Sequence, residues 1–128
     1  MLIYLIDDDS ISLYLTEQVL RIEGFATDIR TFVAAEEALN LLVSRLPAEL
    51  PEVIFLDLNM PVMDGWGFLK ALGPYAPALH GRCRIYILTS SLAPADTARA
   101  RECALVSGII HKPLDEEEIR AIRAAMAA

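Results

Sequence analysis

The sequence predicts an α/β protein in which helices cover both faces of a parallel, doubly wound sheet. Five short runs rich in Ile, Val, Tyr and Phe alternate with longer segments whose apolar residues recur at helical spacing. Most of these runs lack the polar–apolar alternation of a half-exposed strand, which is typical of strands buried on both sides. Strands that alternate with helices favour parallel pairing through right-handed crossovers.

The expected strands are short and evenly distributed along the chain. They cover residues 2–6, 25–30, 53–56, 84–88 and 108–111. The second run contains Thr27, Asp28 and Arg30 and is therefore expected at the edge of the sheet. Five strand–helix units in 128 residues suit the flavodoxin-like strand order 2-1-3-4-5, with five helices.

Each expected helix has an apolar stripe or a recognisable start or stop. The first carries Ile11, Leu15, Val19 and Ile22 and ends by Gly24. The second spans residues 35–46, the third lies around residues 66–72, and the fourth, residues 94–104, has few large apolar side chains to anchor it. The fifth is expected to begin after a capping acid at position 115 and to bury the apolar side chains at 119, 122 and 126.

Length and composition indicate one intracellular domain. A chain of 128 residues fits a single domain covering residues 1–128, and 55% hydrophobic residues suffice to cover both faces of a sheet. The net charge of -7 disfavours direct binding to nucleic acid. No segment reads as a signal peptide or membrane span, so no membrane contact and a cytoplasmic location are expected. Cys83 and Cys103 lack metal-site or redox spacing and are expected to be small buried side chains.

Polar residues follow four of the expected strands. Ligands of open parallel sheets bind beyond the carboxyl ends of the strands, where the strand order reverses. The residues placed there are Asp7, Asp8 and Asp9 after the first strand, Asp57 after the third, Thr89, Ser90 and Ser91 after the fourth, and Lys112 after the fifth. Three or more carboxylates and one lysine are therefore expected to converge at this end of the sheet.

Such a cluster of carboxylates is costly unless some of the carboxyls hold protons or a divalent cation binds to them. Two carboxylates about 4 Å apart repel by roughly 4 kcal/mol at an effective dielectric constant of about 20. Oxygen ligands without His or Cys favour Mg²⁺, or Mn²⁺, over zinc. A carboxylate beside such a metal can accept a phosphoryl group, and Asp57, Lys112 and Thr89 supply the acceptor, the cation and the hydroxyl that this transfer needs.

Four sequence motifs resemble the response-regulator receiver domains of bacterial two-component systems, the family of the chemotaxis regulator. They are IDDDS at 6–10, DLNMPVMDG at 57–65, ILTSS at 87–91 and HKPL at 111–114, and the resemblance extends over the whole chain. It implies a domain without an output domain that is switched by Mg²⁺-dependent phosphorylation and turns over no substrate other than its own phosphoryl group.

The resemblance also implies a role for each site residue. Asp57 would be the modified phosphoacceptor, Asp8 a direct metal ligand, Asp7 a ligand acting largely through water, and Asn59 a donor of its backbone carbonyl to the metal. Thr89 would move to the phosphoryl oxygen and Lys112 would pair with the acceptor. The Lys112–Pro113 bond would be cis, Gly65 would end the loop, and Asn59 and Ser91 would tune the phosphoryl lifetime.

One position departs from the family pattern. Family members often carry Tyr or Phe three residues before the lysine, where this chain has Ile109. The usual coupling between the threonine and an aromatic side chain is therefore not expected. The conformational signal would instead pass through the loop from Ser90 to Pro94 and the fourth helix.

The expected partners follow from the same resemblance. A histidine kinase or histidine phosphotransfer protein would dock on the first helix and the loop after Asp57. A downstream protein target, or a second copy in a homodimer, would use the face made by the fourth helix, fifth strand and fifth helix. That face is expected to carry a basic strip of Arg99, Arg101, His111, Arg120 and Arg123.

Two other functions are compatible with parts of the sequence. A receiver-like interaction module would bind partners without phosphorylation, and Ile109 favours this alternative while the intact acidic set opposes it. A phosphatase with an aspartyl intermediate would need a second acid two residues after the nucleophile, where this chain has Asn59.

Overall fold

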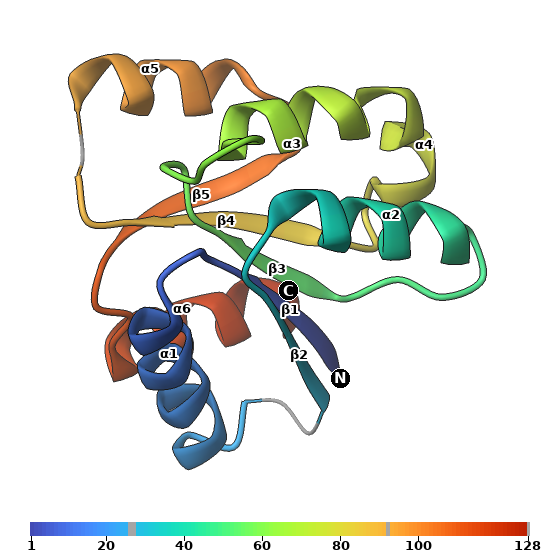
Figure 1. The fold of residues 1–128 in the computed structure, drawn as a ribbon. Coiled ribbons are helices and arrows are strands. Elements are labelled where there is room, and N and C mark those ends of the chain that lie inside the picture. Colours follow the sequence, from blue (N-terminus) through green and yellow to red (C-terminus); the bar gives the residue numbers. More distant parts are fainter. Residues whose placement is uncertain (26–27, 92, 128) are drawn as a thin grey trace.

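The computed structural model describes residues 1–25, 28–91 and 93–127, and these form a five-stranded parallel sheet with helices on both faces (Figure 1). The strand order β2-β1-β3-β4-β5 confirms the predicted topology. The strands are β1 (Leu2–Ile6), β2 (Asp28–Phe32), β3 (Val53–Leu56), β4 (Arg84–Thr89) and β5 (Val106–His111).

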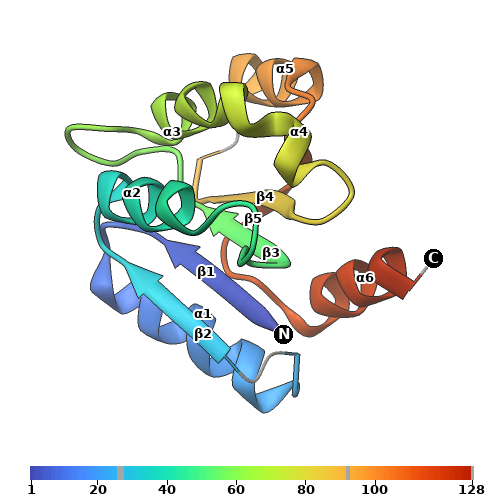
Figure 2. The ribbon, with the colours of Figure 1, turned by 90° about the vertical axis from the view of Figure 1, so that its right-hand side faces the viewer.

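The helices form two layers. Helices α1 (Ser10–Ile22) and α6 (Glu116–Ala127) cover one face of the sheet, and α2 (Ala35–Arg45), α3 (Gly65–Leu72) and α5 (Pro94–Glu102) cover the other (Figures 1 and 2). These are the five expected helices. A 3₁₀ turn, η1 (Gly73–Tyr75), and the four-residue helix α4 (Ala76–Leu79) follow α3 and have no counterpart in the sequence prediction. The sheet separates two apolar cores, one under each helical layer.

Helix α1 buries a different face from the one marked by its apolar stripe. Its buried residues are Leu13, Thr16 and Leu20. By contrast, the side chains of Ile11 and Ile22 are 70% and 80% exposed. The predicted helix is therefore confirmed, but much of its apolar surface faces solvent.

Strand β2 begins later than predicted. Leu2 of β1 pairs with Asp28, and the pairing continues to Phe32, while positions 26 and 27 of the expected strand lie outside the described residues. Phe25 is buried, and its N–H donates to Leu20 O at 3.0 Å. Phe25 therefore closes the end of α1 instead of starting the strand. The edge position of β2 is confirmed.

Strand β5 begins at Val106, which is earlier than predicted. A bulge separates Val106 from the remainder of the strand. Ile85 pairs with Val106 and Tyr86 with Gly108, so Ser107 is the additional residue. A Cβ at Gly108 would lie 3.3 Å from two atoms of the Tyr86 ring. The glycine thus lets β5 approach Tyr86 closely.

Acidic side chains cap three helices at their N-termini. Asp9 accepts from the N–H groups of Ile11 and Ser12, and Asp64 accepts from Gly67 N–H. Asp115 accepts from Glu118 N–H at 2.9 Å, which confirms the predicted cap of α6. Asp9 and Asp64 therefore stabilise helix starts beside the acidic cluster.

The weak anchoring predicted for the helix after β4 is also seen, since α5 buries only Ala100 among its residues.

Both cysteines are unbridged and half-buried, and burial raises the pKa of the Cys83 thiol to about 12. None of the helices in the described ranges has the length and apolar character needed to cross a bilayer.

Candidate functional site

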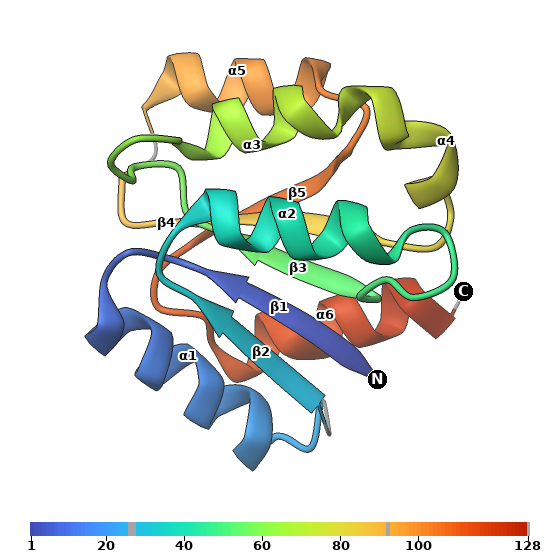
Figure 3. The same ribbon diagram turned by 45° about the vertical axis from the view of Figure 1, so that its right-hand side comes forward.

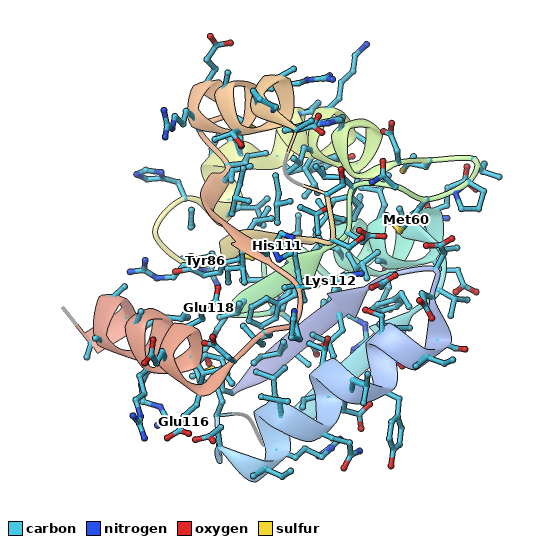
Figure 4. The ribbon with its side chains drawn as sticks, turned by 90° about the vertical axis from the view of Figure 1, so that its left-hand side faces the viewer. Met60, Tyr86, His111, Lys112, Glu116 and Glu118 are labelled. Atoms are coloured by element: carbon cyan, nitrogen blue, oxygen red, sulfur yellow. The ribbon has the colours of Figure 1, made fainter. Side chains whose placement is uncertain are left out.

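Parallel pairing of β1 and β3 brings two aspartates together. Ile6 and Leu56 are paired at the ends of these strands, and Asp7 and Asp57 follow them directly. The N–H of Asp57 donates to Ile6 O at 2.9 Å, which continues the ladder by one residue. Figure 4 views this end of the sheet, with Lys112 at the end of β5 and Met60 in the loop after β3.

Asp7, Asp8 and Asp57 form one cluster of carboxylates. Each offers an oxygen atom, and these atoms lie within 4.8 Å of one another. Asp7 is 5% exposed and Asp57 is 7% exposed, whereas Asp8 is open to solvent. The convergence expected from the strand ends is therefore present in the structure.

Lys112 lies closer to one of the two buried carboxylates than to the other. Its Nζ lies 2.5 Å from Asp7 Oδ2 and 3.8 Å from Asp57 Oδ1. The N–H of Lys112 donates to Thr89 O at 2.8 Å, which fixes the end of β5 against β4. The Lys112–Pro113 bond is cis, as predicted.

The Asp57 carboxyl is harder to ionise than an ordinary aspartate. Its pKa rises from 3.8 to about 6, chiefly because burial removes water, and next because the Asp7 charge repels a second negative charge. The Lys112 ammonium acts in the opposite direction but does not offset both effects. A cation that entered the cluster would favour the ionised form of Asp57.

The donor set of the cluster fits a hard divalent cation. It consists of three carboxylates and no His or Cys, with one member open to water. Mg²⁺ and Mn²⁺ bind such oxygen ligands and retain several water molecules. The residues present therefore fit the metal that the sequence predicts.

Thr89 lies at the end of β4 beside this cluster and is 1% exposed. Its Oγ1 donates to Ser91 O at 3.3 Å and accepts from Ser91 N–H at 3.2 Å. Ser90 and Ser91 are exposed, as is Asn59 in the loop after Asp57. The threonine hydroxyl is thus held by its own loop, and among the residues that the structure describes it has no hydrogen bond to a carboxylate.

Gly65 allows the loop after Asp57 to fold back onto the site. A Cβ at this position would lie 2.7 Å from Asp57 O and 2.9 Å from Leu58 Cα. The N–H of Gly65 donates to Leu58 O at 2.9 Å. In the same loop Val62 has a φ of 69° and is 95% exposed. The loop is therefore tightly closed at Gly65 and strained at Val62.

Ile109 is a half-buried residue of β5. It lines a cavity of about 340 Å³ together with Thr97, Ala100 and Arg101. A branched aliphatic side chain thus leaves open space between the strand and the helix.

The contact between α3 and α5 is not among the features predicted from the sequence. Trp66 Nε1 donates to Asp96 Oδ1 at 3.3 Å, and the Arg99 guanidinium lies 4.5 Å from the centroid of the Trp66 ring. Trp66 is half-buried. No local pattern could have revealed its partners, because 30 positions separate Trp66 from Asp96.

Three of the five residues of the expected basic strip are engaged by other parts of the protein. Arg99 packs on Trp66, Arg120 pairs with Glu116, and Arg123 donates to Glu23 O and lies over Phe25. Within the described residues, only Arg101 and His111 of the five remain exposed without an ion pair or an aromatic contact. The strip is therefore not a continuous basic surface.

Solved structures similar to this one are receiver proteins. A two-component response regulator from Cytophaga hutchinsonii has a TM-score of 0.91 and 26% identity, and the match covers 98% of this chain and 96% of that one. A response regulator receiver protein from Dyadobacter fermentans has a TM-score of 0.88 and 27% identity, with 99% and 98% covered.

Similarity to curated proteins is more local. The transcriptional regulatory protein PrrA of Mycobacterium tuberculosis is 39% identical over 70 residues, which cover 55% of this chain and 28% of PrrA. The family model described as the response regulator receiver domain matches residues 3–123. This chain therefore belongs to the response regulator receiver domain family, whose members are phosphorylation-dependent switches of two-component systems.

Proposed function

We propose that this protein is switched by phosphorylation of Asp57, with a histidine kinase or a histidine phosphotransfer protein as the donor. The observation that carries the proposal is the convergence of Asp7, Asp8, Asp57 and Lys112 at one end of the sheet. Residues 1–128 would act as one domain in the cytoplasm, without contact to nucleic acid or membrane.

In the proposed transfer, an Asp57 carboxylate oxygen attacks phosphorus. The new O–P bond replaces the P–N bond of the donor histidine, whose imidazole leaves. Lys112 is close enough to both buried carboxylates to move its ammonium toward the phosphoryl oxygens. Thr89 can exchange its weak contacts with Ser91 for a hydrogen bond to a phosphoryl oxygen.

The metal site would consist of Asp7, Asp8, Asp57 and the backbone carbonyl of Asn59. Mg²⁺, or Mn²⁺ in its place, would supply positive charge to the phosphoryl oxygens as the group is transferred. Dephosphorylation would follow when water attacks the same phosphoryl group, and Asn59 and Ser91 are the exposed side chains proposed to set its rate.

The exposed apolar side chains of α1 are a suitable docking surface for the donor. Ile11, Tyr14 and Leu15 are 70%, 62% and 56% exposed, and α1 begins three residues after Asp7. Val62 adds a further exposed apolar side chain in the loop after Asp57. The output would use the face of α5, β5 and α6, for a downstream protein or a second copy of the chain.

The switch would pass from Thr89 through Ser90 and Ser91 into α5. Since Ile109 replaces the usual aromatic side chain, the weakly anchored α5 is the element proposed to move. Trp66 would report this movement because it contacts Asp96 and Arg99 on α5.

Acetyl phosphate in the presence of Mg²⁺ tests the proposal directly. The wild-type protein should gain one phosphoryl group by mass, and Asp57→Ala should gain none. Asp64→Asn is the matched control, because it removes a nearby carboxylate while keeping a cap for α3. Undiminished labelling of Asp57→Ala would refute Asp57 as the acceptor.

An alternative is an interaction module that does not use phosphorylation, which the Ile109 position favours. It predicts that Trp66 fluorescence does not change with Mg²⁺ or with acetyl phosphate. A change that needs both reagents and disappears in Asp57→Ala supports the phosphorylation switch, and no change supports the module.

A further inference from the structure

A larger cavity lies at the opposite end of the sheet from the acidic cluster. It has a volume of about 700 Å³ and is bounded by the turn between α4 and β4, the turn between α5 and β5, and the end of α6. In Figure 3 these segments lie at the right-hand end of the molecule, and the loops that follow β1, β3 and β4 lie at the left-hand end. The cavity is therefore separate from the proposed phosphorylation site.

The wall of this cavity is positively charged in an acidic protein. Arg82 and Arg84 line it together with His80, and Glu52 supplies the carboxylate among the lining residues. Two guanidiniums against one carboxylate leave a positive charge, although the chain as a whole carries -7. Within the described residues neither arginine forms an ion pair.

Both guanidiniums are held in place by backbone carbonyls. Arg82 Nη2 donates to Pro47 O at 3.2 Å, and Arg84 Nη2 donates to Ala125 O at 2.9 Å. These bonds come from the segment after α2 and from α6, on opposite sides of the sheet. Each guanidinium retains further N–H groups that can bind a carboxylate, sulfonate or phosphate. Because the two arginine side chains are already ordered, such binding costs little additional conformational entropy.

The remaining wall includes apolar side chains. Leu79, Leu105 and Met126 line the cavity, and its volume is in the range of sites that hold small molecules. We propose that the cavity binds a small organic anion whose acidic group contacts Arg82 and Arg84 and whose apolar part lies on Leu105 and Met126, the half-buried members of these three. A cavity of about 700 Å³ lies within the range of volumes that small molecules fill, which favours a small molecule as the occupant.

Anilinonaphthalene sulfonate tests this site because it joins a sulfonate to an apolar ring system. The folded protein should bind it saturably, with one dye molecule per chain and a rise in fluorescence. Arg82→Glu should raise the dissociation constant at least about tenfold, since it reverses a charge at the wall. Arg84→Gln is a second variant, which removes the charge together with the hydrogen bond to Ala125 O, and it should weaken binding in the same direction. Thermal melting of each variant checks that it remains folded.

Two controls test whether dye binding depends on this cavity and on its positive charge. Arg101→Glu alters the smaller cavity beside α5 and should leave dye binding within about twofold of wild type. N-phenyl-1-naphthylamine, which lacks the sulfonate, should bind more weakly than the sulfonated dye and should be insensitive to Arg82→Glu. Asp57→Ala should bind the sulfonated dye as wild type does, and so should the wild-type protein after treatment with acetyl phosphate and Mg²⁺.

Four results would each overturn the proposal. They are the absence of saturable binding, unchanged binding by folded Arg82→Glu and Arg84→Gln, equal binding of the neutral dye, and an equal loss in Arg101→Glu.

Discussion

Lys112 lies closer to Asp7 than to Asp57, with its Nζ at 2.5 Å from Asp7 Oδ2 and at 3.8 Å from Asp57 Oδ1. One ammonium therefore serves two buried carboxylates, and Asp57 receives the weaker contact. The raised pKa of Asp57, about 6, follows from burial together with this arrangement. In the absence of metal the site is electrostatically unfavourable, and this predicts measurable effects on stability.

Asp57→Asn should stabilise the metal-free protein at neutral pH. The folded-state pKa of Asp57 lies above its unfolded value, so between about pH 4 and pH 6 the folded state binds more protons than the unfolded state. The stability of the wild type consequently falls as pH rises through this window. Urea unfolding with a chelator should show a gain for Asp57→Asn of about 1–2 kcal/mol at pH 7, after allowance for solvent screening, and little gain near pH 4.

Asp28→Asn is the control for this experiment, because it removes an exposed carboxylate at the start of β2, where its 4.0 Å ion pair with Arg30 contributes little. Its stability should differ little from wild type at either pH. A gain in Asp57→Asn that is as large at pH 4 as at pH 7 would show that charge is not its cause.

Asp8→Asn should weaken Mg²⁺ binding much more than Asp9→Asn does. Both variants remove one negative charge at neighbouring exposed positions, but only Asp8 belongs to the carboxylate cluster. Asp9 caps α1, and asparagine caps helices equally well. Titration of Trp66 fluorescence or calorimetry should give a loss of about tenfold or more for Asp8→Asn and about threefold or less for Asp9→Asn.

Equal losses in the two variants would mean that the cluster attracts Mg²⁺ only through its overall charge. No loss in Asp8→Asn would place the metal elsewhere.

The sheet and the strand-end residues could be predicted because their signals are local. A fully apolar run such as Val53–Leu56 indicates a buried strand. Asp7 and Asp57 come directly after the ends of two such strands, so their positions at the edge of the sheet could be predicted. The start of β2 could not be predicted, because Phe25 is apolar enough for a strand and is used instead to close α1. Apolar pattern alone does not tell which core a side chain enters.

The exposed face of α1 and the contact between α3 and α5 also lie beyond sequence reasoning. Ile11 and Leu13 are similar in hydropathy, yet only Leu13 is buried, since the neighbouring sheet and α6 decide which face is covered. The Trp66–Asp96 hydrogen bond depends on the packing of two separate helices. These are the features that a single sequence leaves open.

Gly65→Ala should destabilise the fold by about 1–3 kcal/mol, because the added Cβ would lie 2.7 Å from Asp57 O and the backbone must shift. Gly73→Ala is the matched control, since Gly73 has helical φ and ψ and a Cβ there meets nothing within 4 Å. Thermal unfolding should place Gly73→Ala at or above wild type. Similar losses for both variants would show that close packing at Gly65 is not the cause.

Val62→Gly should stabilise the protein by about 0.5–1 kcal/mol, because a β-branched residue at a φ of 69° is strained and glycine is not. Val33→Gly tests the same loss of side chain at another exposed valine without positive φ, and it should not stabilise. Urea unfolding of the pair measures the difference. A loss of stability in Val62→Gly as large as in Val33→Gly would contradict strain in this loop.

Borohydride reduction after treatment with acetyl phosphate and Mg²⁺ tests the central claim most directly, because it converts an aspartyl phosphate into homoserine at the modified position. Peptide mapping should find homoserine at position 57, dependent on Mg²⁺ and absent in Asp57→Asn. Homoserine at Asp7 or Asp8 in its place, or no homoserine in the folded wild-type protein, would contradict the account.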